Sequence, residues 1–321
     1  MKIPRFSEWS IAPLCREAEN LAESLKISPL LAQILVNRSY RTVEEAQEFL
    51  RPSLSRWENI FLPHSEEFVY FIQQAKREKI PVLIYGDYDV DGITGTCIFV
   101  QYLKSIGIPV WYFIPQRERE GYGIHPDVLP QCQEKKIRLL LTVDCGTEEE
   151  DTVQQFRNAG IEVIVTDHHP SRKPVQSASL FINPQFHNYP FRYLSGSGVA
   201  YKLVQHCAKI LGGNTEGLLA ISALGTIADQ MPLVGENRAI VREGLAEWNR
   251  LVLPAFRSLK TLLLQQDGEW TEEDLARRVA PLINAAGRRD VPHFALEFFL
   301  SRDENTAFHY YHILEEKNQE R

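Results

Sequence analysis

Acidic and imidazole side chains follow three short apolar runs of this sequence. The runs occupy residues 81–86, 139–143 and 161–166. The side chains that come directly after them are Asp87, Asp89, Asp91, Asp144, Asp167, His168 and His169. A single Asp in such a place is usually a helix cap or a turn residue, and a single His pair is usually structural. The joint placement of all three clusters instead favours a shared site.

Carboxylates gathered at one site repel one another, which raises their pKa values unless cations are bound. Carboxylates with one or two imidazoles suit Mn²⁺ or Mg²⁺ better than an ion that prefers thiolates. Five or more acids favour two ions. Such a pair can activate a water and brace a phosphate during in-line displacement.

The elements that position these residues are typical of an α/β protein. Five Val-, Ile- and Leu-rich runs predict strands at residues 81–86, 109–114, 139–143, 161–166 and 180–183, with helical segments between them. This alternation predicts a parallel sheet with helices on both faces. All strand ends then lie at one edge, where open α/β sheets bind ligands. Thr147 and Glu150 have the spacing of a capping box, which predicts a helix start there.

Three parts are expected along the chain. Residues 1–58 form a helical N-terminal segment, with helix starts at Ser28-Pro29 and Thr42. Residues 59–300 form the catalytic domain, with an α/β core at about 80–190 and a helical part at about 195–300. Residues 301–321 are expected to begin a joining helix to a C-terminal domain that this chain lacks. The predicted helical segments of the last two parts are 197–211, 216–228, 236–251, 254–265, 272–279, 292–300 and 303–318.

Composition excludes several classes of protein. Hydrophobic residues make up 44%, too many for a disordered chain, and no run of 18 apolar residues predicts a membrane span. The net charge of -7 excludes a globally basic nucleic-acid binder but leaves room for a local basic groove. Five widely spaced cysteines and the lack of an apolar N-terminal run favour a reducing compartment, so we expect a cytoplasmic protein.

Three motifs at these strand ends resemble those of the DHH phosphoesterase superfamily. They are GDYDVDG, TVDCG and TDHHP. SGSGVAYKL, ALGTIADQMPL and PLINAAGRRD resemble later motifs of its RecJ branch of single-strand-specific exonucleases, and the N-terminal helices and IPQREREGYG also match that branch. The resemblance covers nearly the whole chain and implies a metal-dependent exonuclease. Such an enzyme degrades single-stranded DNA from the 5′ end in repair and recombination.

The same resemblance assigns site residues. It implies two Mn²⁺ or Mg²⁺ ions, with Asp91 and Asp144 as the candidates to bridge them. The metal ligands would be Asp89, Asp91, Asp144, His168 and Asp229. From spacing alone Asp229 is equally a helix-end cap. Asp87 is expected just outside the ligand set, and the catalytic residues would be Asp91, Asp144, His168 and His169. Arg117 and Arg288 resemble phosphate-contacting arginines.

Two alternatives stay open at this point. One is a DHH phosphodiesterase that acts on short oligonucleotides or cyclic dinucleotides. The other is a replication or repair scaffold without catalytic activity. The expected partner is single-stranded DNA. The resemblance also implies a single-strand-binding protein and a helicase, and no membrane partner is expected.

Overall fold

A computed structural model of the protein describes residues 15–186, 188–264, 268–288 and 292–320. The chain divides into two compact units, Met1–Ser53 and Leu54–Arg321. The division lies slightly before residue 58, where the sequence places the end of the helical N-terminal segment. The first unit contains α1 (Arg16–Leu25), α2 (Pro29–Asn37) and α3 (Val43–Leu50) around its own small apolar core.

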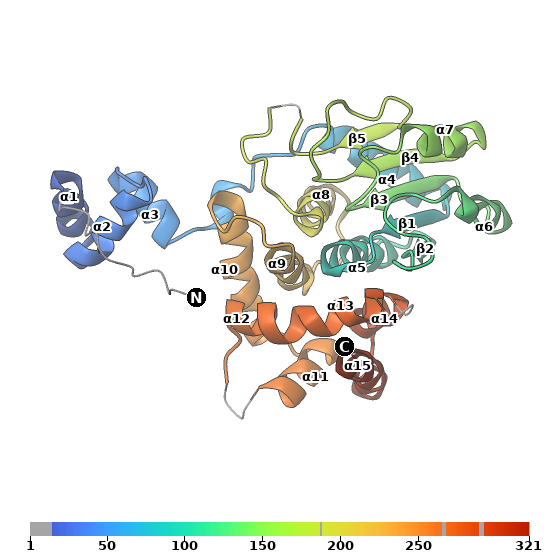
Figure 1. The fold of residues 1–321 in the computed structure, drawn as a ribbon. Coiled ribbons are helices and arrows are strands. Elements are labelled where there is room, and N and C mark those ends of the chain that lie inside the picture. Colours follow the sequence, from blue (N-terminus) through green and yellow to red (C-terminus); the bar gives the residue numbers. More distant parts are fainter. Residues whose placement is uncertain (1–14, 187, 265–267, 289–291, 321) are drawn as a thin grey trace, which may run out of the picture. The chain divides into compact units, whose positions relative to one another are not determined.

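The second unit contains a five-stranded parallel sheet (Figure 1). Its strands are β1 (Val82–Gly86), β2 (Val110–Phe113), β3 (Leu139–Val143), β4 (Glu162–Thr166) and β5 (Leu180–Ile182). They are ordered β2-β1-β3-β4-β5, and every pairing is parallel. All five strands lie where the apolar runs predict them. Strands β1, β3 and β4, which precede the acidic clusters, are neighbours in the sheet.

Helices cover both faces of this sheet. The helices of the second unit are α4 (Ser65–Glu78), α5 (Val90–Ser105), α6 (Leu129–Glu134), α7 (Glu150–Asn158), α8 (Gly196–Leu211), α9 (Leu218–Ala228), α10 (Gly235–Arg250), α11 (Pro254–Leu263), α12 (Glu272–Asp274), α13 (Ala280–Arg288), α14 (Pro292–Leu300) and α15 (Glu304–Gln319). Short 3₁₀ turns occupy Leu54–Arg56 and Pro126–Val128, and a π-helical turn occupies Leu275–Val279.

Alternate residues of the strands enter two separate cores, as the two-residue period of a strand requires. Val82 and Ile84 of β1 join a large cluster with side chains from α4, α5, α8 and the later helices. Leu83 and Tyr85 join a smaller cluster with side chains from α6 and α7. The predicted α/β fold with a parallel sheet and helices on both faces is therefore confirmed.

Two predictions about helix ends are wrong. Thr147 does not cap α7. Glu149 is the residue just before that helix, and its side chain makes no capping hydrogen bond. The N–H of Thr147 donates to Asp167 instead. The helix predicted to end at residue 279 continues into α13, although Pro281 follows. A proline ring collides with the carbonyl four residues earlier and lacks an N–H. The π-helical turn Leu275–Val279 immediately before it relieves that conflict by widening the helix.

None of the helices in the described ranges is long and apolar enough to cross a membrane.

Candidate metal centre

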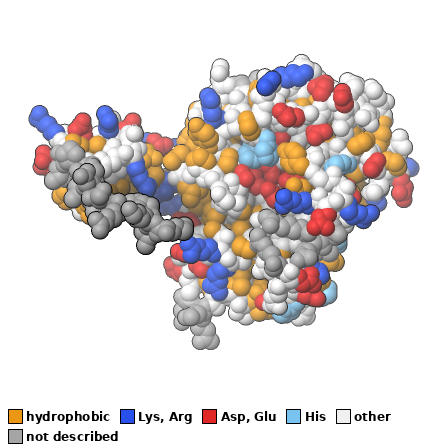
Figure 2. All heavy atoms as spheres, viewed as in Figure 1, with side chains coloured by type: hydrophobic (Ala, Val, Ile, Leu, Met, Phe, Trp, Pro, Cys, Tyr) orange, Lys and Arg blue, Asp and Glu red, His pale blue; other side chains and the backbone are white. Residues whose placement is uncertain are grey.

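The acidic side chains singled out above meet at one edge of the sheet. Strands β1, β3 and β4 each end there, and α9 delivers a further acid, Asp229, from its C-terminal end. On the face shown in Figure 2, acidic side chains and histidines form one patch over the second unit. The patch exists because parallel neighbouring strands run in the same direction, so that their following loops meet.

Three overlapping groups of side chains have the spacing of metal ligands. Within each group, one ligand atom per residue lies within 4.8 Å of the others. The groups are Asp87, Asp89 and Asp144; Asp91, His168 and Asp229; and Asp144, Asp167, His168 and His169. Asp144 belongs to two of them and so does His168, so the three groups form one continuous centre.

His168 lies in the middle of this centre. Its Nε2 atom is 3.0 Å from Oδ1 of Asp144, 3.6 Å from Oδ2 of Asp229 and 3.8 Å from Oδ2 of Asp91. Burial lowers the pKa of His168, so burial favours the neutral imidazole, which is the form that ligates metals. One imidazole nitrogen therefore faces three carboxylates.

Several polar atoms of the centre are buried without a hydrogen-bond partner. Among the described residues, Oδ1 of Asp87, Oδ1 of Asp144 and Nε2 of His168 are in this state. A buried polar atom without a partner costs about 1–3 kcal/mol, so three at one place call for a further ligand. Carboxylate oxygens beside a neutral imidazole nitrogen all offer lone pairs. The residues therefore fit a hard or borderline divalent cation.

The pKa values of the carboxyls indicate the same need. Burial, with the nearby charge of Asp89, raises the pKa of Asp87 to about 8. Burial and the charge of Asp91 raise the pKa of Asp229 to about 7 and that of Asp144 well above its ordinary value. Carboxylates so close together cannot all ionise at neutral pH without positive charge. Bound cations would supply that charge.

The carboxylate of Asp91 is fixed by the N-terminus of α8. Its Oδ2 accepts the N–H of Gly196 at 2.5 Å, and its Oδ1 accepts the N–H of Ser197 at 3.0 Å. Only glycine permits this approach, because a Cβ on Gly196 would lie 2.7 Å from Cβ of Asp144. The SGSG segment that opens α8 therefore places two of the acids at once.

Asp144 has an unusual backbone conformation for a residue with a side chain. Its φ is +62°, in the left-handed region that Asp and Asn tolerate better than most residues. This conformation turns the chain sharply after β3. The carboxyl of Asp144 consequently lies in the middle of the centre, 2% exposed.

Asp167 is a buried anchor for the imidazole of His169. Its Oδ1 accepts a hydrogen bond from Nδ1 of His169 at 2.8 Å and from the N–H of His168 at 2.7 Å, while its Oδ2 accepts the N–H of Thr147. Burial alone would lower the pKa of His169, but this hydrogen bond and the charge of Asp167 outweigh it and raise that pKa to about 9. In the metal-free protein this pair therefore favours the protonated imidazole at neutral pH.

A polar cavity of about 340 Å³ adjoins the acids. Asp87, Tyr88, Asp89, Arg117, Ala228, Gln230 and Asn284 line it. The guanidinium of Arg117 lies over the Tyr88 ring, 5.5 Å from its centre. Arg117 is therefore placed beside the carboxylates, as a phosphate-contacting residue would be. The side chain of Arg288 lies outside the described part of the structure.

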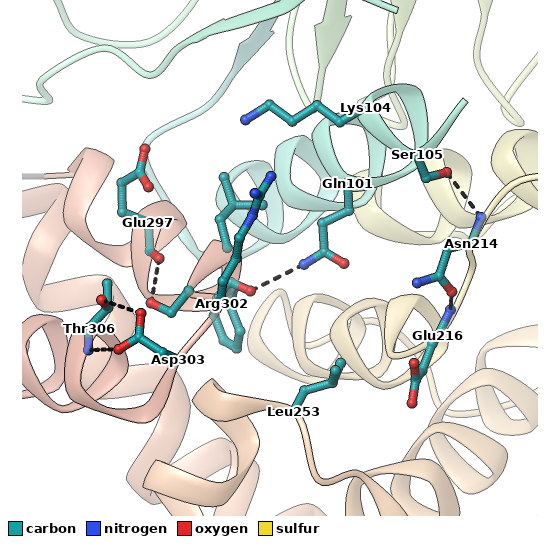
Figure 3. Close-up of a pocket in the computed structure, with 13 residues that line it drawn as sticks. Gln101, Lys104, Ser105, Asn214, Glu216, Leu253, Glu297, Arg302, Asp303 and Thr306 are labelled. Carbon is teal, nitrogen blue, oxygen red and sulfur yellow. Dashed lines mark hydrogen bonds between the residues drawn. The ribbon is translucent and has the colours of Figure 1, made fainter. Parts of the chain in front are cut away.

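A larger cavity, of about 630 Å³, lies at the other end of α5 (Figure 3). Gln101, Lys104 and Ser105 of α5 line it together with residues of the α14–α15 turn such as Arg302. The described residues that line it include no member of the metal-ligand groups. Helix α5 spans about 22 Å between the two places, at about 1.5 Å per residue. This larger cavity is not the centre of the chemistry.

All the acids that the sequence singles out therefore lie together, and Arg117 lies beside them. Asp87 was expected just outside the ligand set, yet it lies within ligand spacing of Asp89 and Asp144. Sequence reasoning assigns no individual role to Asp167 or Gly196. The two glycines of SGSGVAY indicate that the backbone comes close to another group there, but they do not indicate which acid it contacts.

Comparison with known proteins identifies relatives of this chain. Residues 81–226 match the DHH family, N-terminal domain. The single-stranded-DNA-specific exonuclease RecJ of Bacillus subtilis is 33% identical over 98% of this chain and 40% of its own length. The crystal structure of RecJ in complex with Mn²⁺ from Thermus thermophilus superposes with a TM-score of 0.82 at 30% identity, covering 97% of this chain and 45% of that one.

A second solved structure, of exonuclease RecJ bound to manganese, superposes with a TM-score of 0.74 at 34% identity, covering 81% of this chain and 66% of that one. The chain spans between 40% and 54% of the length of the curated proteins named RecJ that it matches. The motifs, the fold and the matches along almost all of the chain agree, and the chain belongs to the RecJ branch of the DHH family.

Proposed function

We propose that the protein is a metal-dependent nuclease that hydrolyses phosphodiester bonds of single-stranded DNA from the 5′ end. The observation that carries this proposal is the continuous centre of acids and imidazoles around the unpartnered atoms of Asp87, Asp144 and His168. The names of the relatives support the substrate, since they are single-stranded-DNA-specific exonucleases.

The ligand spacing supports two ion positions. Asp87, Asp89 and Asp144 would hold one ion, and Asp91, His168 and Asp229 the other. Oδ1 of Asp144 and Nε2 of His168 are 3.0 Å apart, so the two groups of donors adjoin. Mn²⁺ or Mg²⁺ suits these donors. One solved RecJ structure is a complex with Mn²⁺ and another is a complex with Mg²⁺. Divalent ions held by these residues would supply positive charge for the phosphate in the transition state and would lower the pKa of a bound water.

The chain's own residues would complete the reaction. The pKa of His169, raised to about 9 in the metal-free protein, suits a proton donor, and Asp167 fixes its ring through Nδ1. Nε2 of His169, the other nitrogen of the ring, would give a proton to the leaving oxygen. Arg117 offers a planar fork of N–H donors to a phosphate in the adjoining cavity.

The proposal extends to the setting of the enzyme. A nuclease of this kind would act on strands exposed during DNA repair and recombination, with a single-strand-binding protein and a helicase as the partners that present them. The cytoplasm is the proposed compartment. All five cysteines are without disulfides, four of them buried, which suits a reducing environment.

The direct test is a nuclease assay of the 321-residue chain with added Mn²⁺. The substrates are a single-stranded oligonucleotide labelled at either end, its duplex and a dinucleotide, and Asp144→Asn is the control for contaminating nucleases. Nucleotides released from the 5′ end of the single strand alone support the proposal. Hydrolysis of the dinucleotide alone would identify a small-substrate phosphodiesterase instead. Bound manganese without hydrolysis of any of these substrates would favour a scaffold.

A further inference from the structure

Helix α13 contacts the loop that carries the first acids, almost two hundred residues earlier in the chain. Oδ1 of Asn284 accepts the backbone N–H of Val90 at 3.3 Å. Val90 is the first residue of α5, whose initial N–H groups have no acceptor within the helix. The Asp89 side chain accepts the next two, from Asp91 and Gly92. Asn284 therefore completes the cap of the helix that holds Asp91.

A glycine brings the same helix against this loop. A Cβ on Gly287 would lie 2.0 Å from the carbonyl oxygen of Tyr88. Gly287 has no positive φ, so its backbone is open to other residues and only the contact excludes them. Asn284 and Gly287, which we call the loop clamp, are three residues apart and hence on the same face of α13.

The π-helical turn before α13 determines which face of α13 carries the loop clamp. The turn Leu275–Val279 adds a residue to one turn of a helix that otherwise continues from α12. One extra residue rotates everything after it by about 100° about the helix axis. Without it, Asn284 and Gly287 would lie on a different face of the helix.

The loop clamp also lies beside the place where the substrate is expected. Asn284 lines the cavity of about 340 Å³ together with Asp87, Asp89 and Arg117. The N–H of Val90 requires an acceptor, which fixes the orientation of the Asn284 amide. The first acids, Arg117 and Asn284 thus surround one space.

We propose that Asn284 is a positioning residue for the metal centre. Through Val90 it fixes the start of α5 and so the places of the Asp89 and Asp91 carboxylates, and Gly287 allows α13 close enough to do this. The inference rests on the proposed function for its catalytic meaning. Its direct readout, however, is metal affinity, which does not depend on which substrate is cleaved.

The test compares four forms of the full chain: wild type, Asn284→Leu, Asn284→Asp and the control Asn305→Ala on the exposed side of α15. Leucine has a similar volume but no acceptor, whereas aspartate keeps an acceptor for Val90. We expect Asn284→Leu to bind Mn²⁺ about ten-fold more weakly in titration calorimetry. Asn284→Asp should restore the affinity, and Asn305→Ala should leave it unchanged. Thermal unfolding in EDTA shows that each variant is folded.

Salt separates the hydrogen bond from the added charge of aspartate. At about 0.5 M KCl, screening weakens an effect of charge alone, whereas rescue through the Val90 hydrogen bond persists relative to wild type. Unchanged Mn²⁺ affinity in Asn284→Leu, or a rescue by aspartate that disappears in high salt, would overturn the inference. If wild type binds Mn²⁺ but cleaves no single-stranded DNA, the proposed function fails, and the loop clamp is still judged on affinity.

Discussion

The imidazole of His169 is held by the carboxylate of Asp167, whose Oδ1 accepts its Nδ1–H at 2.8 Å. Asp167 is completely buried, whereas the His169 side chain is 42% exposed. The pair therefore combines a fixed, buried carboxylate with an imidazole ring that substrate can reach. It resembles the arrangement in which a carboxylate sets the tautomer and raises the basicity of a working histidine.

Replacing Asp167 by Asn should uncouple this pair. The pKa of His169 should fall from about 9 towards its ordinary value, because the hydrogen bond to a charged acceptor is lost. NMR titration of the metal-free protein measures that fall. If His169 is the general acid, hydrolysis at pH 8 should drop about 10²-fold. An unchanged His169 pKa in the variant would contradict the assignment.

Asp144→Asn should remove activity while stabilising the metal-free protein. Asn tolerates the positive φ at this position, so the variant removes the charge without the backbone strain that alanine would add. We expect hydrolysis to fall by about 10³-fold or more. In EDTA at pH 8 the unfolding temperature should rise by about 2 °C, because a buried, repelled carboxylate is gone. A lower unfolding temperature than wild type would show that repulsion at this site is unimportant.

As pH rises, the metal-free protein should lose stability and its affinity for metal should increase. The pKa of Asp87 is raised to about 8 and that of Asp229 to about 7, against about 4 in an unfolded chain. Between these values the folded state binds more protons than the unfolded state. The metal-free protein should therefore lose stability as pH rises from about 4 to 8.

The protons held by these carboxyls must leave when a cation binds, so Mn²⁺ affinity should increase between about pH 6 and 8. Titration calorimetry in buffers of different ionisation enthalpy counts the protons released. Affinity that is flat over this range, without proton release, would mean that the carboxyls are already ionised.

Gly196→Ala should damage the centre, whereas Gly198→Ala in the same helical turn should not. The added methyl group at Gly196 would lie 2.7 Å from Cβ of Asp144, while the closest atom to one at Gly198 is an ordinary 3.4 Å away. Overpacking of this kind costs about 1–3 kcal/mol, and it would displace Asp91 and Asp144 together. Chemical denaturation and Mn²⁺ titration of both variants measure the difference. Equal behaviour would show that α8 can move without affecting the acids.

The sequence predicted the strands and the common edge because each depends on local patterns. A buried run such as residues 139–143 ends in an acid, and the topology of parallel sheets then brings such ends together. The contact of Asp91 with Gly196 joins positions more than a hundred residues apart, and no local pattern encodes it. The capping box predicted at Thr147 has the right local spacing, but a distant residue overrides it. The carboxylate of Asp167 accepts the Thr147 N–H, which in a capping box would donate to Glu150.

The separation of the ligands along the chain has a consequence for synthesis. The side chains of the centre begin at Asp87 and end at Asp229. They follow β1, β3 and β4 or belong to α5 and the end of α9, and all these elements must be in place. Contacts between such distant positions form late in folding, because long loops must close first. A chain still emerging from the ribosome without Asp229 holds an incomplete set of ligands. The order of residues thus delays the metal centre until most of the α/β core and α9 have been made.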